Sequence, residues 1–220
     1  MPDAPPAGAV PPGWDHNPTS LSRRALLSLL AAAGLAIALY LTLFQLRAFD
    51  TVWDPWFESR KVLELTEPVP DALAGVLAYG AELLLLALGG RDRWRSLPWV
   101  CLALGLTLAT GGAVSIALIV IQPTVAAAWC TLCLASACLS LSLLALGFGE
   151  ARAAWQHVRR ARTRGVAFGD AFWGRAAAVP LRGGESPEVQ AVDVRSGSSL
   201  VVAALLLASW LARPRRPAGR

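Results

Sequence analysis

The sequence predicts an all-α membrane protein, a bundle of four transmembrane helices to which a short apolar segment near the C-terminus could add a fifth. Of the 220 residues, 55% are hydrophobic and only 16% are charged, whereas about a quarter of the residues of a soluble domain carry charge. The charges are also unevenly spread, because residues 96–149 (54 residues) and 25–46 (22 residues) contain no Asp, Glu, Lys or Arg. Since one crossing needs about 20 apolar residues, the shorter stretch fits one span and the longer stretch fits two.

The chain begins with a segment that we expect to be disordered, residues 1–20, because most of it is rich in Pro, Ala and Gly without an apolar period. The first helix is expected to follow in SLSRRALLSLLAAAGLAIALYLTLFQL (residues 20–46). Its Arg23-Arg24 start resembles an export signal, but the apolar stretch is longer than that of a signal and no small-x-small cleavage motif follows. We therefore expect a retained helix, with a cleaved signal as the alternative.

The second span is expected between Asp71 and Arg91. Pro70 and Asp71 suit its first turn, because proline needs no hydrogen-bond donor there and an acidic side chain favours the positive end of a helix. The sequence between Asp71 and Arg91 is apolar apart from a few polar side chains, one of which is Glu82.

The long uncharged stretch is expected to divide at Gln122-Pro123, because proline disfavours continuation of a helix. This division gives a third span over residues 97–121 and a fourth over residues 126–148. The connection between them is only a few residues long, so we expect the two helices to be antiparallel neighbours. Together with the two preceding spans, they make the four-helix membrane domain of residues 21–149.

The orientation follows from the arginines, because basic residues collect on the cytoplasmic side of membrane helices. Three basic clusters fall on one side of a four-span arrangement. We therefore expect a protein of the plasma or inner membrane with its N-terminus in the cytoplasm. The loop of residues 47–71 has three basic and six acidic residues and is expected outside. The same bias explains the net charge of +5 without nucleic acid as a partner. The three basic clusters on the cytoplasmic side are Arg23 and Arg24; Arg91, Arg93 and Arg95; and Arg152, Arg159, Arg160, Arg162 and Arg164.

The C-terminal part is expected to comprise a basic cytoplasmic segment, residues 150–198, and a short apolar segment with a basic tail, residues 199–220. In the first, AWQHVRRARTR (residues 154–164) suggests a surface helix on anionic lipid. In the second, residues 200–212 are apolar over only 13 positions, so both a short span and an interfacial segment stay open.

Two cysteines carry the clearest chemical signal, since Cys130 and Cys133 form a Cys-x-x-Cys motif at the outer start of the fourth span. On a helix this spacing puts the two sulfurs on one face, about 60° apart and roughly 4.5 Å along the axis, which allows a disulfide with local adjustment. The free N–H groups of a first helical turn acidify a thiol, and the thiolate is the nucleophile of disulfide exchange. We expect a catalytic redox pair, with packing as the alternative.

The remaining titratable side chains of the spans are weaker candidates. Cys101 and Cys138 are expected to pack, because they lie far from the pair or on another face. No metal site is expected, since neither histidine lies in an apolar stretch. Glu82 is the one acidic residue inside a span, so a functional carboxyl and a structural one are both open. Tyr79 would bind a ligand or pack between helices.

Four stretches accompany the cysteine pair at the start of the fourth helix: AIALYLTL, PVPDALAGVLAYGAELL, RWRSLPW and SIALIVIQP running into WCTLC. In these stretches and in the position of the pair, the sequence resembles the vitamin K epoxide reductase (VKOR) family, in its bacterial form. The resemblance covers roughly residues 30–148.

The resemblance implies a four-helix bundle around a quinone, either menaquinone or ubiquinone. The residue matching Cys133 would pass electrons to the quinone, and the residue matching Cys130 would exchange disulfides with other thiols. Asp71 stands near a position that hydrogen-bonds a quinone carbonyl in the family, and Tyr79 matches a recurrent aromatic residue. We expect Glu82 and Trp129 to contribute to the same cofactor site.

The sequence departs from the family in the outer loop, where residues 47–71 contain no cysteine. Ser59 is interpreted as standing in the place of a loop cysteine, and serine cannot relay electrons. We therefore expect a quinone-dependent thiol/disulfide oxidoreductase that accepts electrons directly from a periplasmic or other extracytoplasmic thiol protein, such as a thioredoxin-like one. The alternative is a non-catalytic quinone-binding or structural membrane module that keeps the fold.

Overall fold

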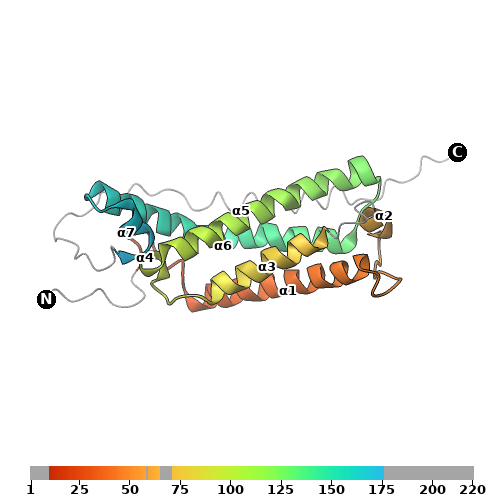
Figure 1. Cartoon of the computed structure of the whole chain (residues 1–220), viewed down its shortest axis with the longest axis horizontal. Coiled ribbons are helices and arrows are strands. Elements are labelled where there is room, and N and C mark those ends of the chain that lie inside the picture. Colours follow the sequence, from red (N-terminus) through yellow and green to blue (C-terminus); the bar gives the residue numbers. More distant parts are fainter. Residues whose placement is uncertain (1–9, 58, 65–70, 176–220) are drawn as a thin grey trace.

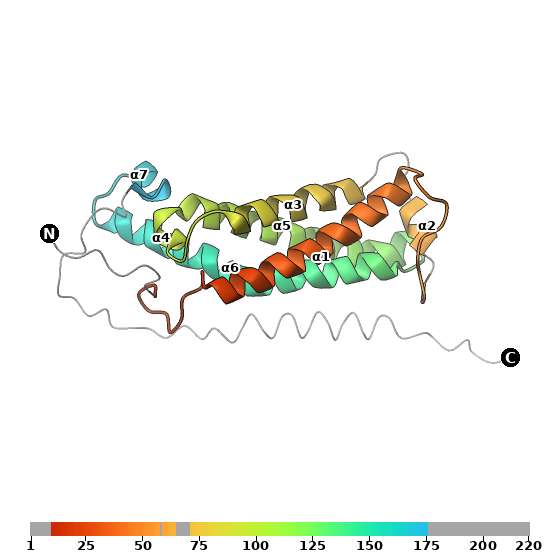
Figure 2. The ribbon, with the colours of Figure 1, turned by 90° about the horizontal axis from the view of Figure 1, so that it is seen from below.

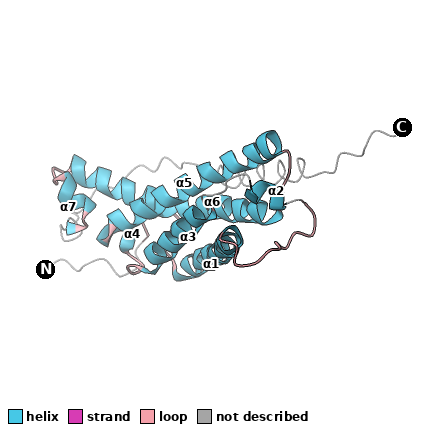
Figure 3. Cartoon of the chain, turned by 45° about the vertical axis from the view of Figure 1, so that its right-hand side comes forward, coloured by secondary structure: helices cyan, strands magenta, loops and turns pink. Residues whose placement is uncertain are grey.

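The computed structural model describes residues 10–57, 59–64 and 71–175. Every regular element among them is helical (Figure 3). Four long helices form a bundle, with three short helices at its two ends (Figure 1). In chain order the elements are α1 (Leu21–Gln45), α2 (Ser59–Glu64), α3 (Ala72–Ala87), α4 (Arg93–Ser96), α5 (Pro98–Ile121), the π-helical turn η1 (Gln122–Ala126), α6 (Thr131–Thr163) and α7 (Phe168–Phe172).

The long helices alternate in direction, because each connection joins the end of one helix to the start of the next at the same end of the bundle. Helix α1 packs against α3 and α6, and α5 packs against α6 and α3. Figure 2 shows the four helices running side by side along the length of the bundle. Their interior is an apolar core whose buried members are Leu27, Ala31, Ala38, Tyr79, Leu86, Leu104, Leu108 and Leu143.

Within the described part of the chain, three segments are long and apolar enough to cross a membrane: Leu21–Gln45, Pro98–Ala126 and Thr131–Thr163. The outward faces of the first two carry many exposed leucine, isoleucine and valine side chains, as lipid-facing surfaces do. The expected second span corresponds to α3, which has only 16 residues and is shorter than these three. The all-helical architecture is thus confirmed, whereas the count of four membrane spans stays a prediction.

Glycines allow the closest approaches between these helices. A Cβ atom at Gly105 of α5 would overlap the Cβ atom of Ala151 on α6, and one at Gly147 of α6 would overlap Leu108 on α5. The antiparallel pair α5–α6, which the sequence predicts, therefore packs closely at these two glycines. This pair carries the short η1 connection to the cysteine motif.

The end of the bundle that holds α4 contains buried charge. Arg93 is fully buried and donates hydrogen bonds to the backbone carbonyls of Leu85 (2.9 Å) and Leu88 (3.1 Å) and to Glu150. Arg24 of α1 donates to the carbonyls of Leu86 and Gly89. Because the last carbonyls of a helix have no intrahelical donor, the two guanidinium groups satisfy the C-terminal end of α3 and fix where it stops.

Two C-terminal features differ from the expectations. The stretch AWQHVRRARTR belongs to α6 itself, which continues without a break from Thr131 to Thr163, so it is not a separate surface helix. Ala153 and Ala154 of this extension are buried in a small cluster with Trp94 and Cys101, and this packing supports the helix beyond residue 148. The expected apolar segment of residues 200–212 lies outside the described residues.

The N-terminal residues that the structure describes contact the same end of the bundle. Trp14 donates a hydrogen bond from its indole nitrogen to the Gln156 side chain (3.1 Å), and the Asn17 amide donates to the Arg91 carbonyl (3.0 Å). Thr19 is buried. The contacts of residues 14–19 therefore tie the segment before α1 to α6 and to the connection between α3 and α4.

Candidate redox site at the disulfide end

Cys130 and Cys133 are joined by a disulfide, with their Cα atoms 5.2 Å apart. Cys130 is the residue that precedes α6, in extended backbone, and its sulfur accepts a hydrogen bond from the Cys133 backbone N–H (3.1 Å). The sulfur therefore occupies the capping position of the helix, where orphan N–H groups and the helix dipole stabilise a thiolate. We call the end of the bundle that holds this pair and α2 the disulfide end (Figure 1).

The chain reaches Cys130 through an irregular connection that Gln122 organises. Helix α5 ends in the π-helical turn η1, and Ala127 adopts a left-handed backbone conformation (φ 49°). The buried Gln122 side chain accepts a hydrogen bond from the Cys130 backbone N–H (3.0 Å). Proline at 123 interrupts the α-helical ladder as predicted, and the freed backbone turns sharply enough to place the disulfide at the start of α6.

The loop after α1 is tied to the start of α6 by Asp54 and Ser59. The Thr131 hydroxyl donates to the Asp54 carboxylate (2.5 Å), and the Thr131 backbone N–H donates to the Ser59 hydroxyl (3.2 Å). The same carboxylate accepts from the backbone N–H groups of Phe57 (2.9 Å) and Ser59 (2.6 Å). Ser59, which the sequence led us to interpret as standing in the place of a loop cysteine, satisfies an orphan N–H of the helix that carries the redox pair.

The Asp54 carboxylate is ionised at physiological pH. Burial is the largest single influence and favours the neutral form, but hydrogen bonds from Ser59, Thr131 and the backbone N–H of Phe57 together outweigh it. They lower the pKa of Asp54 from 3.8 to about 2. A full negative charge therefore stands at the N-terminal end of α6.

The two sulfurs have different surroundings. Cys130 is 0% exposed, whereas Cys133 is partly buried and packs against an apolar cluster whose buried members are Leu41, Phe44 and Leu63. Leu63 belongs to α2, so the loop and its short helix cover the pair. A protein thiol can reach Cys130 only after this cover has moved.

Further into the bundle from the disulfide, the Tyr79 side chain of α3 contacts α6. Its hydroxyl donates to the Ser136 carbonyl (2.9 Å) and lies 2.7 Å from the Ser140 hydroxyl oxygen. Gly34 of α1 leaves room for the ring, since a Cβ atom there would overlap it. Ser136 and Ser140 follow Cys133 at helical spacing, so a polar stripe runs from the disulfide into the bundle.

Glu82 is buried in the bundle, one turn beyond Tyr79. It is only 3% exposed, and its Oε2 atom has no hydrogen-bond partner in the described part of the chain. Gly111 of α5 faces its other oxygen, since a Cβ atom there would lie 3.7 Å from Oε1. An orphan carboxyl oxygen in an apolar interior is costly, so this atom marks a place where a polar ligand atom would be stabilised.

The other predicted cofactor residues lie nearer the surface. Asp71 is exposed and accepts a hydrogen bond from the Gln45 side chain (2.5 Å). Trp129 is partly buried and immediately precedes the disulfide. Tyr79 and Glu82 thus share the bundle interior, whereas Asp71 precedes the start of α3 at the disulfide end. The free cysteines, Cys101 (buried) and Cys138 (partly buried), take no part in this site.

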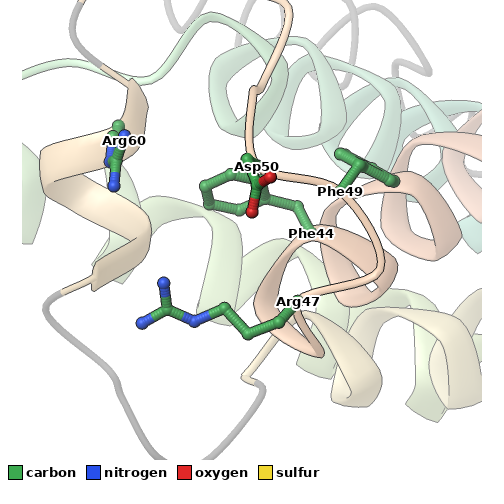
Figure 4. Close-up of a pocket in the computed structure, with 5 residues that line it drawn as sticks. All are labelled: Phe44, Arg47, Phe49, Asp50 and Arg60. Atoms are coloured by element: carbon green, nitrogen blue, oxygen red, sulfur yellow. The ribbon is translucent and has the colours of Figure 1, made fainter.

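A small pocket of about 30 Å³ lies beside the loop, lined by Phe44, Arg47, Phe49, Asp50 and Arg60 (Figure 4). Its aromatic members, Phe44 and Phe49, also belong to the apolar cluster around Cys133. None of the predicted cofactor residues lines it, and it is far too small for a quinone ring.

Comparison with known proteins gives one match. The model of the vitamin K epoxide reductase family matches residues 25–148, which is more than half of the chain. The match includes most of α1, all of α3 and α5, and the cysteine motif. No curated protein and no solved structure matches the sequence.

Proposed function

Because the chain belongs to the vitamin K epoxide reductase family, and is therefore a membrane protein of an oxidoreductase family, we propose that it is a thiol:quinone oxidoreductase. In this proposal the Cys130–Cys133 disulfide takes electrons from the thiols of another protein and passes them to a membrane quinone. The observation that carries the proposal is the disulfide itself, which is held at a helix N-terminus beside an apolar cluster.

The thiol half of the reaction follows from disulfide exchange. A thiolate of the partner attacks one sulfur of the pair, the Cys130–Cys133 bond breaks, and a mixed disulfide forms. A second partner thiol displaces the enzyme's sulfur, which leaves an oxidised partner and two cysteine thiols in the enzyme. Reoxidation of these two thiols to the Cys130–Cys133 disulfide would release two electrons and two protons, and these would reduce a quinone held at the site to the quinol. Cys133 is the proposed electron donor, because it faces the apolar cluster.

The residues present fit a quinone. The cluster around Cys133 offers an apolar surface for the ring, and Tyr79 supplies a hydroxyl that is held in place by Ser136 and Ser140. The orphan Oε2 atom of Glu82 could hydrogen-bond a polar ligand atom deeper in the bundle. We propose Tyr79 and Glu82 as interior contacts, with Asp71 and Trp129 at the mouth of the site.

The placement in the cell belongs to the same proposal. With the basic clusters on the cytoplasmic side, the disulfide end would face an oxidising compartment outside the cell membrane, where such a pair can cycle. The partner would be a thioredoxin-like or other thiol protein that docks at the loop of residues 47–64 and displaces it. Direct exchange is motivated by the absence of cysteine from residues 47–71.

The redox state of the pair tests the proposal against a purely structural disulfide. Membranes that contain the protein are treated to oxidise or to reduce their quinone pool, and free thiols are then trapped with a mass tag. We expect the pair to carry two tags when the pool is reduced and none when it is oxidised. A pair that stays untagged in both conditions would support the non-catalytic membrane module instead.

A further inference from the structure

We propose that Asp54 sets the reduction potential of the Cys130–Cys133 pair, by holding a negative charge at the N-terminus of α6 that disfavours the thiolate form. This role rests on the proposed function only in that the pair is redox-active. The potential itself is measured without a quinone or a partner, so the two proposals can fail separately.

The geometry fixes the carboxylate at this point. The Asp54 carboxylate accepts hydrogen bonds from three loop N–H groups, those of Trp56, Phe57 and Ser59, and from the Thr131 hydroxyl. Thr131 is the first residue of α6 and is directly bonded to Cys130. With four donors, the carboxylate is held in one place at the start of the helix that carries both cysteines.

The charges at this helix end oppose one another. The free N–H groups and the dipole of α6 favour a thiolate at Cys130 or Cys133, and the Cys133 N–H already donates to the Cys130 sulfur. The Asp54 carboxylate repels the same thiolate. Cys130 is fully buried and Thr131 is 8% exposed, whereas Asp54 is partly exposed. Solvent therefore screens the repulsion on the loop side only, and not from the side of the buried cysteine.

The consequence for electron transfer has a definite sign. Reduction of the disulfide takes up two electrons and two protons and gives two thiols, and a stabilised thiolate draws this equilibrium toward the reduced form. A carboxylate that destabilises the thiolate therefore lowers the reduction potential. The pair becomes a weaker oxidant of thiols and a stronger electron donor, as a pair that passes electrons onward to a quinone requires.

The test is the redox equilibrium of the purified full-length protein in detergent, measured in glutathione buffers at pH 8 by mass-tag labelling. Asp54→Asn keeps the shape and one acceptor oxygen but removes the charge. We expect this variant to shift the equilibrium toward the dithiol by about three- to tenfold, which for a two-electron couple is about 15–30 mV. Asp50→Asn makes the same charge change in the same loop, where the side chain is exposed, and should shift it less than about twofold.

Further outcomes decide against the proposal. An unchanged equilibrium in Asp54→Asn, or an equal shift in Asp50→Asn, would overturn it. If the pair of the variant is labelled faster but keeps the same equilibrium, Asp54 only holds the loop against α6 and does not set the potential. If Asp54→Asn does not fold, Thr131→Val serves in its place, because it breaks the link to the carboxylate with little change of shape. It should shift the equilibrium in the same direction, and no shift would contradict the proposal.

Discussion

Replacing Cys133 with alanine should reduce dithiol-dependent quinone reduction to the uncatalysed background. Cys133 is partly buried and packs against the apolar cluster. In the variant, the fully buried Cys130 has no second sulfur nearby with which to reform a disulfide. Loss of a group that forms the covalent intermediate commonly costs several orders of magnitude. The measurement is the absorbance of a short-chain quinone analogue during turnover with dithiothreitol by the purified protein.

A matched control distinguishes chemistry from folding. Cys138 lies on the same helix, is partly buried and is free, so Cys138→Ala removes an equal volume without touching the pair. This variant should retain nearly full activity. Activity retained by Cys133→Ala would contradict the proposed electron path, whereas an equal loss in both variants would indicate a general effect on α6.

Replacing Arg93 with methionine should destabilise the protein by about 3–5 kcal/mol, the usual cost of removing one partner from a buried ion pair. Arg93 and Glu150 are both 0% exposed at their side chains. Methionine keeps much of the length of the side chain but leaves the Glu150 charge uncompensated and the carbonyls of Leu85 and Leu88 without their donor. The measurement is unfolding in mixed micelles with increasing SDS.

Arg95 supplies the control for this prediction. It lies two residues away and pairs with Asp92 at 3.5 Å near the surface, and such pairs contribute about 0–1 kcal/mol. Arg95→Met should therefore have a small effect. In the double variant Arg93→Met/Glu150→Leu, much of the lost stability should return because the unpaired charge is gone. Equal stability of Arg93→Met and the unaltered protein would show that the pair does not hold this end together.

The long helices could be predicted from the sequence because lipid-facing helices are marked by uncharged runs and by proline. The expected third span, residues 97–121, agrees closely with α5 (Pro98–Ile121). The fourth was expected to end at residue 148, where charge returns, but α6 continues to Thr163. Its continuation depends on tertiary packing of alanines against Trp94 and Cys101, which no local charge pattern indicates. The short helices α2 and α4 were missed because neither has an apolar period.

The candidate site could be predicted in part. The spacing of Cys130 and Cys133 indicated a disulfide, and the structure contains it. The roles of Gln122, Ser59 and Asp54 were missed, because the bonds of the last two to Thr131 join residues 72 and 77 positions apart in sequence. One local signal was available: Asp54 in DPWFES is placed to accept from backbone N–H groups two and three residues on, as aspartate does in turns.

The cover over Cys130 gives the proposed reaction an order of events. A partner must first displace the loop of residues 47–64, and this movement breaks the bonds of Asp54 and Ser59 to Thr131. Loss of the Asp54 contact would itself favour the thiolate that leaves during exchange. Docking and chemistry would therefore be coupled through one side chain, which the Asp54→Asn equilibrium measurement addresses.

A single-turnover reaction tests the central claim most directly. The purified protein is reduced with dithiothreitol under anaerobic conditions, freed of excess reductant, and mixed with one equivalent of a short-chain quinone analogue. The account predicts one quinol formed per protein, together with the return of the Cys130–Cys133 disulfide and the loss of both mass tags. A folded protein whose pair keeps both thiols while the quinone stays oxidised would contradict it.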